Sequence, residues 1–415
     1  MATFVLIRRP RVVTRCLETT RRGQFWINPS RGRSQQVSAS GNSSTTDSFT
    51  VKGQPSHVHL KPECSKAALS VKAAGKWTPS QGNTYEECAT CVIAALKQFD
   101  ELGFVVHPEK SAFNPSQIIM VLGFIINSVD MTVTLTDEKR TDITNMCDTV
   151  LNSRKIKIRD LAQLIGKLIA SFPGVVHGPL YYRSLEADKT KALRISKGNF
   201  DDTMGLSENS RLELRWWLAN ISHVHNVISH KLPSCTLTTD ASLSGWGAVF
   251  QTSKTGGTWG EGEKHHHINY LELLALYLGL QTYCSSLNDT HVRVRLDNTT
   301  AVAVINHMGT SHSAQCNALG KEIWEWCIMR NIWLSAAHVP GIENTEADFE
   351  SRQKQSNTEW MLNHKRLHEA LLKLDFVANV DVFASRLNTQ FPSYISYRPD
   401  PGAKAVDVFL LTYPK

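Results

Sequence analysis

Four carboxylates lie in one segment of the chain, in runs whose patterns suggest a shared site. Asp240 interrupts the β-rich run "CTLTTDA", Glu272 lies in the helical run "NYLELLA", and Asp297 follows the strand-like run "HVRVRL". Asp348 lies in "ENTEADFESR", which begins a helical pattern. Burying carboxylates together is prohibitive unless a cation neutralises them. Two hard divalent ions about 4 Å apart would satisfy such a group and serve phosphoryl displacement, one activating water and one stabilising the leaving oxygen.

Each acid taken alone is more simply interpreted as a surface charge or a helix cap. That interpretation is weaker for Asp240, because its neighbours Thr239 and Ala241 belong to an otherwise apolar strand. It is also weaker for the four acids as a set, because they follow one another within residues 234–352, which hold 12 acidic against 7 basic residues. We therefore expect the four side chains to bind metal together.

The elements that must position these acids alternate between strands and helices. Period-two alternation predicts strands at "CTLTTDA" and "GWGAVFQT", with the tight turn "SLSG" between them. Further along, the pattern predicts a helix, a strand, two helices, a strand and a last helix. This order predicts an α/β fold whose sheet begins with an antiparallel meander.

The segments on either side of residues 234–352 have their own patterns. In residues 82–135 a helical stripe precedes two β-branched runs, "GFVVHPEKSAF" and "IIMVLGFIINS", which we expect "NPSQ" to join. Residues 136–233 are predicted to be helical, with the adjacent Trp216 and Trp217 packed inward. Residues 353–415 are interpreted as a small C-terminal extension.

The N-terminal segment is basic and polar. Residues 1–82 hold 13 basic against 3 acidic residues, and Ser, Thr, Gly and Gln dominate from Ser30 to Ser56. Such a stretch cannot bury enough apolar surface to offset its chain entropy, so we expect residues 1–81 to be disordered. A transit peptide and a phosphate-binding tail are the alternatives.

The rest of the composition is that of an ordinary globular chain. It contains 41% hydrophobic and 20% charged residues. Nine cysteines, an odd number in a long chain, favour a reducing compartment over a disulfide framework. No apolar run approaches the roughly 18 residues that a membrane span needs. These features favour the nucleus or the cytoplasm over secretion or a membrane.

The runs "TTDASLSGWGAVF", "HINYLELLAL", "RLDNTTAVAVIN" and "HVPGIENTEADFESR" resemble the type 1 ribonuclease H domain of retroelement polyproteins, most closely the DIRS-like group. Residues 82–135 resemble the end of a reverse-transcriptase palm with its primer-grip hairpin. Residues 136–233 resemble the thumb and connection, with the thumb in the run "IRDLAQLIGKLIASFPGVVHGPLYYRSLEADK". The run "VDVFASRLNTQFPSYISYRPDPGAKAVDVF" is similar to the tail of this group. The resemblance covers roughly residues 82–412. It implies a mixed five-stranded ribonuclease H-like sheet with flanking helices, preceded by a partial α+β palm and thumb.

The resemblance also implies an activity and its site. The family cleaves the RNA strand of RNA–DNA hybrids with two Mg²⁺ ions, for which Mn²⁺ is a possible substitute. The resemblance therefore implies that the chain binds nucleic acid and does not bind a membrane. By position, the family's metal-binding carboxylates match Asp240, Glu272, Asp297 and Asp348. Such an enzyme must sense a 2′-hydroxyl on one strand and a DNA backbone on the other.

Three polar residues near these acids are candidate substrate contacts. Asn269 and Asn298 stand beside two of the acids and are candidates for minor-groove contacts through their amides. A helix cap and a turn residue are equally good interpretations of this pair. His338 stands ten residues before Asp348 and is a candidate catalytic loop histidine. However, "HVPG" sits at a strand end, and a short loop would keep His338 outside that role.

The polymerase part lacks the acids that the resemblance requires. An aspartate pair should fall just before Gly82, where "LSVKAAGKWTPSQ" contains no Asp. Asp201 and Asp202 follow the thumb-like region and are interpreted as a helix-start cap. The fingers and the front of the palm are also missing. We therefore expect a truncated element without DNA polymerase activity.

Two alternatives to a hybrid-cleaving ribonuclease stay open. One is a non-catalytic nucleic-acid-binding remnant, the product of a pseudogene, because the palm that would help to hold the substrate is missing. The other is a different nuclease on the same fold, such as a resolvase or an integrase. The place of Glu272 between the first and second Asp favours ribonuclease H, because transposase-type sites place their Glu last.

Overall fold

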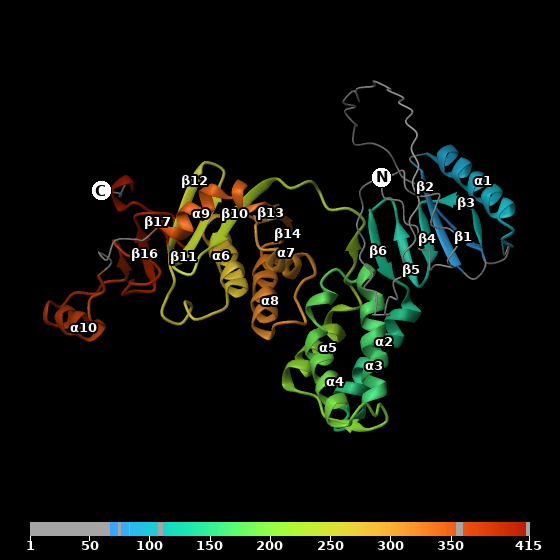
Figure 1. Cartoon of the computed structure of the whole chain (residues 1–415), viewed down its shortest axis with the longest axis horizontal. Coiled ribbons are helices and arrows are strands. Elements are labelled where there is room, and N and C mark those ends of the chain that lie inside the picture. The colour runs from blue at the N-terminus through green and yellow to red at the C-terminus, as the bar shows by residue number, and fades with distance from the viewer. Residues whose placement is uncertain (1–66, 74–75, 83, 107–110, 354–359, 412–415) are drawn as a thin grey trace, which may run out of the picture. The chain divides into compact units, whose positions relative to one another are not determined.

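The computed structural model describes residues 67–73, 76–82, 84–106, 111–353 and 360–411 (Figure 1). The chain forms two compact units, of which the first ends at Thr132 and the second begins at Val133. In the described part of the chain no helix is both long and apolar enough to cross a membrane. The seven cysteines within that part are free thiols.

The first unit is built from antiparallel strands and one helix. Strand β1 (Ala67–Ala73) pairs with β2 (Lys76–Gly82) on one side and with β3 (Ala112–Ser116) on the other, antiparallel in both cases. Helix α1 (Tyr85–Glu101) packs against this sheet. Its N-terminus is capped by Thr84, whose hydroxyl accepts a hydrogen bond from a first-turn amide.

This sheet corrects two expectations. Strand β1 and all of β2 except its last residue lie inside residues 1–81, where the composition predicts disorder, so the predicted tail is too long. The physical reason is that pairing with β3, more than 30 residues away, orders this segment, and local composition carries no signal of such pairing. The expected "NPSQ" connection is also wrong, because Asn114, Pro115 and Ser116 belong to β3. Residues 1–66 lie outside the described residues.

A hairpin occupies the second β-branched run. Strand β4 (Ile118–Val121) pairs antiparallel with β5 (Phe124–Asn127). The two residues between them, Leu122 and Gly123, have φ angles of 53° and 79°. Two-residue hairpin turns of this kind need the left-handed backbone, which Gly adopts without strain. The short strand β6 (Thr132–Leu135) follows at the junction of the two units.

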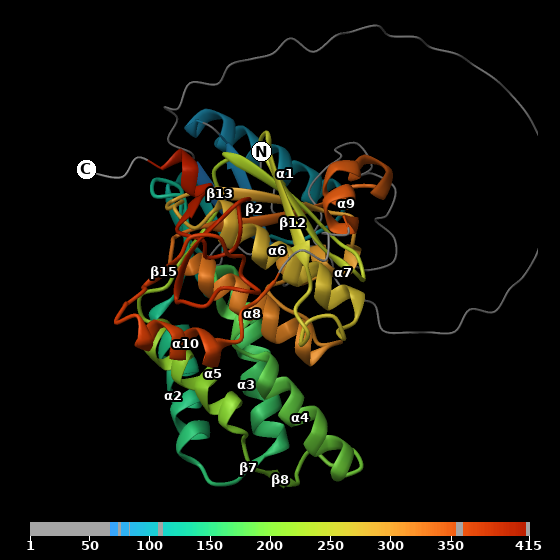
Figure 2. The same ribbon diagram turned by 90° about the vertical axis from the view of Figure 1, so that its left-hand side faces the viewer.

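The second unit begins with four helices, which lie side by side in both Figure 1 and Figure 2. They are α2 (Asp137–Asn152), α3 (Ile158–Ser171), α4 (Arg183–Ile195) and α5 (Glu208–Asn220). Helix α3 shows why this region folds: Leu161, Leu164 and Leu168 recur at helical spacing and are fully buried. The short strands β7 (Ile156–Lys157) and β8 (Thr203–Met204) pair with each other.

Aromatic residues hold these helices together. Trp217 is fully buried and donates its indole N–H to the backbone oxygen of Tyr181 at 2.7 Å. Trp216 is half-buried and stacks on the Tyr181 ring, with centroids 4.0 Å apart. Both tryptophans therefore contribute to packing, as the helical spacing predicts.

Two acids of the helical part have structural partners. Glu213 is buried and accepts hydrogen bonds from the backbone amides of Ser184 at 3.0 Å and Leu185 at 3.1 Å, so it caps α4. The sequence predicts that Asp201 caps the start of a helix, and this prediction is wrong. Asp201 forms two hydrogen bonds of 2.9 Å with the exposed guanidinium of Arg159.

A five-stranded mixed sheet forms the centre of the second unit. Its strands are β10 (Cys235–Ala241), β11 (Gly245–Phe250), β12 (Ser253–Thr258), β13 (His291–Leu296) and β14 (Trp333–His338). Their order is β12-β11-β10-β13-β14. The first three form an antiparallel meander, and β10, β13 and β14 run parallel. The predicted mixed five-stranded sheet with flanking helices is confirmed.

Helices cover both faces of this sheet. They are α6 (Ile268–Tyr283), α7 (Thr299–Asn306), α8 (Ala314–Ile328) and α9 (Thr345–Arg352). Helix α6 approaches Ala248 of β11 closely at Gly279, whereas α9 packs against Gly247. Because neighbouring residues of a strand point to opposite faces, α6 and α9 lie on opposite faces of β11.

The C-terminal extension contains α10 (His364–Lys373) and a small sheet. Strands β15 (Val380–Asp381), β16 (Ser393–Ser396) and β17 (Ala405–Val406) lie in that order and run parallel. The extension contacts β12 through a hydrogen bond of 2.5 Å from the Thr255 hydroxyl to the backbone oxygen of Pro399.

The helical part also touches the sheet domain directly. The Tyr181 hydroxyl donates to Glu325 of α8 at 3.3 Å, and the ammonium of Lys321 lies 4.6 Å from the Tyr181 ring centroid. On the linker between the two parts, His230 stacks on Trp333 of β14 with centroids 3.5 Å apart. These contacts belong to one compact unit.

Candidate active site

The site lies at the carboxyl ends of two parallel strands. In the register of β10 and β13, Thr238 is the partner of Arg295. Two residues further along, Asp240 and Asp297 come to the same end of the sheet. Open α/β sheets bind ligands at the carboxyl ends of their strands. The parallel pairing thus brings together two acids that are 57 residues apart in the sequence.

A third acid reaches the same place from α6. One carboxylate oxygen each from Asp240, Glu272 and Asp297 lies within 4.8 Å of the other two. Asp240 and Glu272 are 3% and 4% exposed, and Asp297 is half-buried. The structure therefore brings together three of the four acids that the sequence singles out.

The electrostatics of this group favour a cation. Burial raises the pKa of Glu272 to about 9, and the nearby charges of Asp240 and Asp297 add to this rise. Burial also raises the pKa of Asp240, against a hydrogen bond from Ser351 that lowers it. Glu272 Oε2 is buried and accepts no hydrogen bond from the described residues. Three crowded carboxylates with an unpaired oxygen fit a hard divalent cation, which prefers oxygen ligands.

Asp240 is held by two residues that the sequence analysis missed. The Ser351 hydroxyl donates to Asp240 Oδ2 at 2.6 Å, and Asn344 Nδ2 donates to Oδ1 at 3.2 Å. Both donors belong to the α9 segment, four residues before and three residues after Asp348. In a helix, side chains at this spacing lie near the same face as Asp348. The sequence therefore contained a signal that Asn344 and Ser351 lie near the site.

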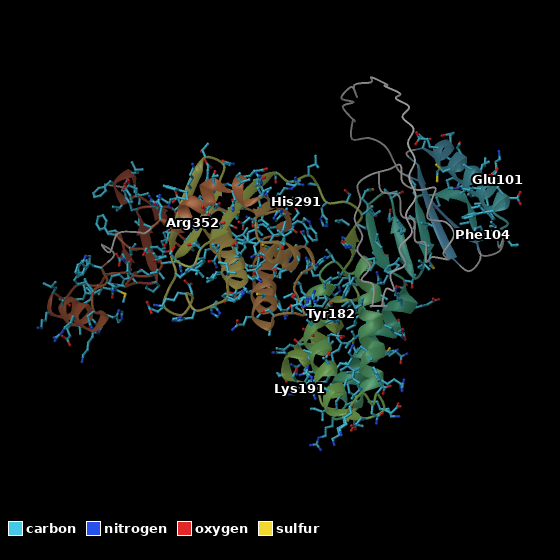
Figure 3. All side chains as sticks on the ribbon, viewed as in Figure 1. Glu101, Phe104, Tyr182, Lys191, His291 and Arg352 are labelled. Carbon is cyan, nitrogen blue, oxygen red and sulfur yellow. The ribbon has the colours of Figure 1, made fainter. Side chains whose placement is uncertain are left out.

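Asp348 itself lies outside the group of three. Its carboxylate accepts a hydrogen bond of 2.6 Å from Arg352 Nε, one turn further along α9. Figure 3 shows Arg352 at the end of this helix. The charge of Asp348 is nevertheless close enough to raise the pKa of Asp240. The structure thus places Asp348 beside the site, paired with a guanidinium.

Close backbone packing fixes the position of α9. A Cβ atom on Gly247 would lie 2.7 Å from the backbone nitrogen of Ser351, and one on Gly256 would lie 2.8 Å from the backbone oxygen of Glu350. Real Cβ atoms essentially never come this close, so these strand positions admit only Gly without a shift of the helix. The glycines therefore allow α9 to bring Ser351 to Asp240.

The two candidate asparagines form a pair. Asn298 Nδ2 donates to Asn269 Oδ1 at 2.9 Å, while Asn298 Oδ1 caps α7 by accepting from the Ala301 amide at 2.9 Å. Asn298 is therefore a helix cap, whereas Asn269 is not, because the N-cap of α6 is His267. Asn269 lies one turn before Glu272 on α6, and its own Nδ2 has no acceptor among the described residues. One amide of the pair is free to meet a ligand.

Among the described residues, His338 is not part of the group of three acids. It is the last residue of β14, opposite Leu296, the residue before Asp297. Its side chain is exposed and forms no hydrogen bond within the described residues. The strand-end position that "HVPG" predicts is confirmed.

Comparison with known proteins gives structural similarity only. No protein-family model matches the chain. A search of curated proteins found no match. Among solved structures, the foamy viral protease-reverse transcriptase in complex with RNA/DNA hybrid is 14% identical, with a TM-score of 0.32, and the match covers 71% of this chain and 38% of the viral one.

Ribonucleases H1 match a smaller part of the chain. LC11-RNase H1 in complex with RNA/DNA hybrid is 21% identical, with a TM-score of 0.25 and coverage of 28% of this chain and 92% of that one. RNase H1 from the archaeon Halobacterium salinarum is 19% identical, with a TM-score of 0.24 and the same coverage. Across the foamy viral structures, this chain spans between 38% and 54% of their length.

Proposed function

We propose that residues 234–352 are a ribonuclease that cleaves the RNA strand of RNA–DNA hybrids with Mg²⁺. The observation that supports this most is the group of three carboxylates within 4.8 Å at the carboxyl ends of β10 and β13. Glu272 reaches the group from the first helix after the meander, in the order that the resemblance requires. The same resemblance leads us to propose that the chain derives from a DIRS-like retroelement.

In this proposal Asp240, Glu272 and Asp297 hold the cations, and Asp348 joins them from α9. Bound divalent ions supply an activated water and stabilise the leaving oxygen of the phosphodiester. Ser351 and Asn344 keep the Asp240 carboxylate in one orientation. Arg352 competes with metal for Asp348, because its guanidinium occupies one carboxylate oxygen.

The Asn269–Asn298 pair offers hydrogen-bond donors that could recognise the substrate. Asn298 is fixed by its bonds to α7 and to Asn269, so the remaining amide N–H groups of Asn269 are pre-oriented donors. Minor-groove base edges and 2′-hydroxyls of a hybrid accept such donors. We propose that this pair contacts the substrate, and that His338, exposed beside the site, does so from β14.

The polymerase reaction is not part of the proposal. The hairpin of β1 and β2 lies where the resemblance requires the palm aspartates, and residues 67–82 contain no Asp or Glu. Without carboxylates this hairpin offers no ligand for the metal ions of nucleotide transfer.

Cleavage of a labelled RNA–DNA hybrid in Mg²⁺ tests the proposal. The full chain is compared with Asp240→Asn and Asp297→Asn, with single-stranded RNA and duplex DNA as control substrates. Cleavage confined to the hybrid and lost in both variants is expected, with products that carry a 5′-phosphate and a 3′-hydroxyl. A folded protein that binds the hybrid and Mg²⁺ without cleaving would instead establish the alternative, a non-catalytic nucleic-acid-binding remnant.

A further inference from the structure

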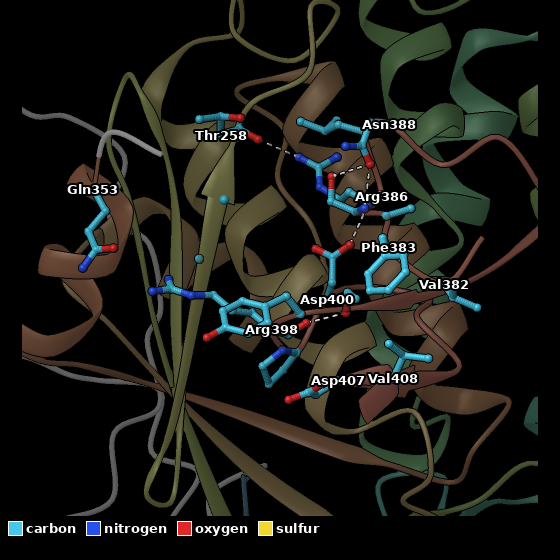
Figure 4. Close-up of a pocket in the computed structure, with 18 of the residues that line it drawn as sticks. Thr258, Gln353, Val382, Phe383, Arg386, Asn388, Arg398, Asp400, Asp407 and Val408 are labelled. Carbon is cyan, nitrogen blue, oxygen red and sulfur yellow. Dashed lines mark hydrogen bonds between the residues drawn. The ribbon is translucent and has the colours of Figure 1, made fainter. Parts of the chain in front are cut away.

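A cavity that none of the three acids lines lies between strand β12 and the C-terminal extension (Figure 4). Its volume is about 610 Å³, which is in the range of small-molecule pockets. Its walls come from Gly256–Thr258 of β12, from Gln353 after α9, and from three stretches of the extension. Those stretches are residues 382–388, 396–400 and 407–409.

Three aromatic side chains line this cavity and are open to solvent. Phe383, Tyr397 and Phe409 are 69%, 83% and 83% exposed. The rings of Phe383 and Phe409 have centroids 5.8 Å apart and are tilted by 46°, so they do not stack face to face. Exposed aromatic rings at one cavity are typical of a binding site, because a ligand that covers their apolar faces removes a large apolar area from water.

Three of the four charged side chains of the walls, Arg386, Arg398 and Asp400, have partners inside the protein. Arg386 forms hydrogen bonds of 2.8 and 2.9 Å with Glu263 and is mostly buried. Arg398 pairs with Glu350 at 3.4 Å. Asp400 accepts from the Tyr394 hydroxyl at 2.7 Å. These three charges are therefore compensated within the protein, which favours a ligand group without net charge beside them.

Polar groups for the edge of a ligand remain at the cavity. Asp407 has a φ of 55° and accepts a hydrogen bond from the Phe409 amide through one carboxylate oxygen, Oδ1. Gln353 lines the opposite wall, and its side-chain amide forms no hydrogen bond within the described residues. A planar ring with apolar faces and a polar edge would stack on the aromatic side chains and form hydrogen bonds with Asp407 and Gln353. A nucleobase is such a ring.

From this combination we propose that the cavity binds an unpaired nucleobase. The base belongs to a single strand that continues beyond the hybrid, and this assignment rests on the proposed ribonuclease function. Gln353 directly follows Arg352, the residue that pairs with Asp348. A base in the cavity would therefore contact the end of the helix that also carries Ser351 and Asp348.

Fluorescence of 2-aminopurine tests this proposal with the full chain made inactive by Asp240→Asn. The probe is placed in a short single-stranded overhang of a hybrid, and the matched ligand is the same hybrid with blunt ends. Quenching on binding, and about tenfold tighter binding of the overhang form, are expected because stacking of a base on aromatic side chains stabilises a bound single strand.

Substitutions separate the cavity from the rest of the surface. In the double variant Tyr397→Ala, Phe409→Ala the quenching and the tenfold preference should disappear, while affinity for the blunt hybrid stays unchanged. Phe376→Ala is the control, because Phe376 is an exposed aromatic of the same extension and does not line the cavity. Quenching that survives in the double variant, or no quenching in the intact cavity, overturns the proposal.

The free nucleoside and the free strand complete the experiment. Quenching of 2-aminopurine riboside alone, without a preference for the overhang, would keep the nucleobase as ligand and overturn the single strand as its source. Failure of the ribonuclease function would be recognised separately, since intact protein would leave the blunt hybrid uncleaved while still quenching a 2-aminopurine oligonucleotide.

Discussion

At the scale of single residues, the orientation of Asp240 is the most strongly determined feature of the site. Each of its carboxylate oxygens has its own donor, Ser351 for Oδ2 and Asn344 for Oδ1. Hydrogen bonds to an ionised carboxylate are stronger than those between neutral groups. Residues that orient a metal ligand in this way affect metal affinity without touching the metal.

We expect Ser351→Ala to weaken Mg²⁺ binding by about tenfold, because Asp240 loses the donor that fixes Oδ2. Calorimetric titration of the full chain with Mg²⁺ measures the change. Ser286→Ala is the matched control, since Ser286 is an exposed turn residue away from α9. Equal affinities for Ser351→Ala and the control would show that Ser351 does not position the acid.

At the scale of elements, α9 is placed by contact between backbones. The helix has only eight residues and few buried side chains, so its own apolar face contributes little to its position. The glycines of β11 and β12 let it approach until backbone atoms touch. A short helix held in this way depends on the shape of the strand surface more than on its own sequence.

Replacing Gly247 by Ala should therefore displace α9. The added methyl would lie 2.7 Å from the Ser351 amide nitrogen, and overpacking of this kind costs about 1–3 kcal/mol. We expect a lower melting temperature together with loss of hybrid cleavage. Gly262→Ala serves as the control, because a Cβ there meets nothing within 4 Å. If Gly247→Ala behaves like the control, the glycine contact does not hold the helix.

A second prediction at this scale concerns the cap of α4. Glu213→Ala leaves the buried amides of Ser184 and Leu185 without acceptors, so we expect a loss of about 1–3 kcal/mol in the free energy of unfolding. Urea denaturation measures it. Glu208→Ala, at an exposed ion pair with Arg215, should cost no more than about 1 kcal/mol. Similar losses for the two variants would contradict the cap.

Elements with a strong local signal could be predicted from the sequence, whereas those positioned by distant contacts could not. The succession of strands and helices along residues 234–352 follows from the period-two and helical runs, and Asp240, Glu272 and Asp297 do converge. Strands β1 and β2 escaped prediction because their order depends on pairing with β3. The role of Ser351 escaped it for a similar reason, since its partner lies 111 residues away.

At the scale of the whole second unit, two histidines lie where the helical part meets the sheet domain. His177 lies near Trp324, with ring centroids 6.4 Å apart, and His230 stacks on Trp333. Burial lowers the pKa of both rings to about 4; the neighbouring His230 adds to the effect for His177, and His291 adds to it for His230. Both are therefore neutral in the folded protein at neutral pH.

Protonation should loosen this contact. Between pH 6.5 and 4 the unfolded chain binds protons that these histidines do not bind when folded, so their contribution to stability is lost as the pH falls through this range. The raised pKa of Glu272 makes the folded protein more stable as the pH falls, which is the opposite effect. The test therefore compares the stability change of a histidine variant with that of the unchanged protein. We expect His230→Phe to lose less stability than the unchanged protein between pH 7 and 5, as measured by urea denaturation. An identical loss would contradict the assignment.

The contact of Tyr181 with α8 bears on how the chain can be divided for experiments. A fragment that starts at residue 234 would lack Tyr181 and His230. The residues that these two contact, Lys321, Glu325 and Trp333, would then become more exposed to solvent. One that stops at residue 352 would also lose the extension's cover over β12. Aggregation or early melting of such a fragment would therefore follow from the lost contacts and would not count against the proposed activity. The helical part and the extension belong in the same expressed polypeptide as the sheet.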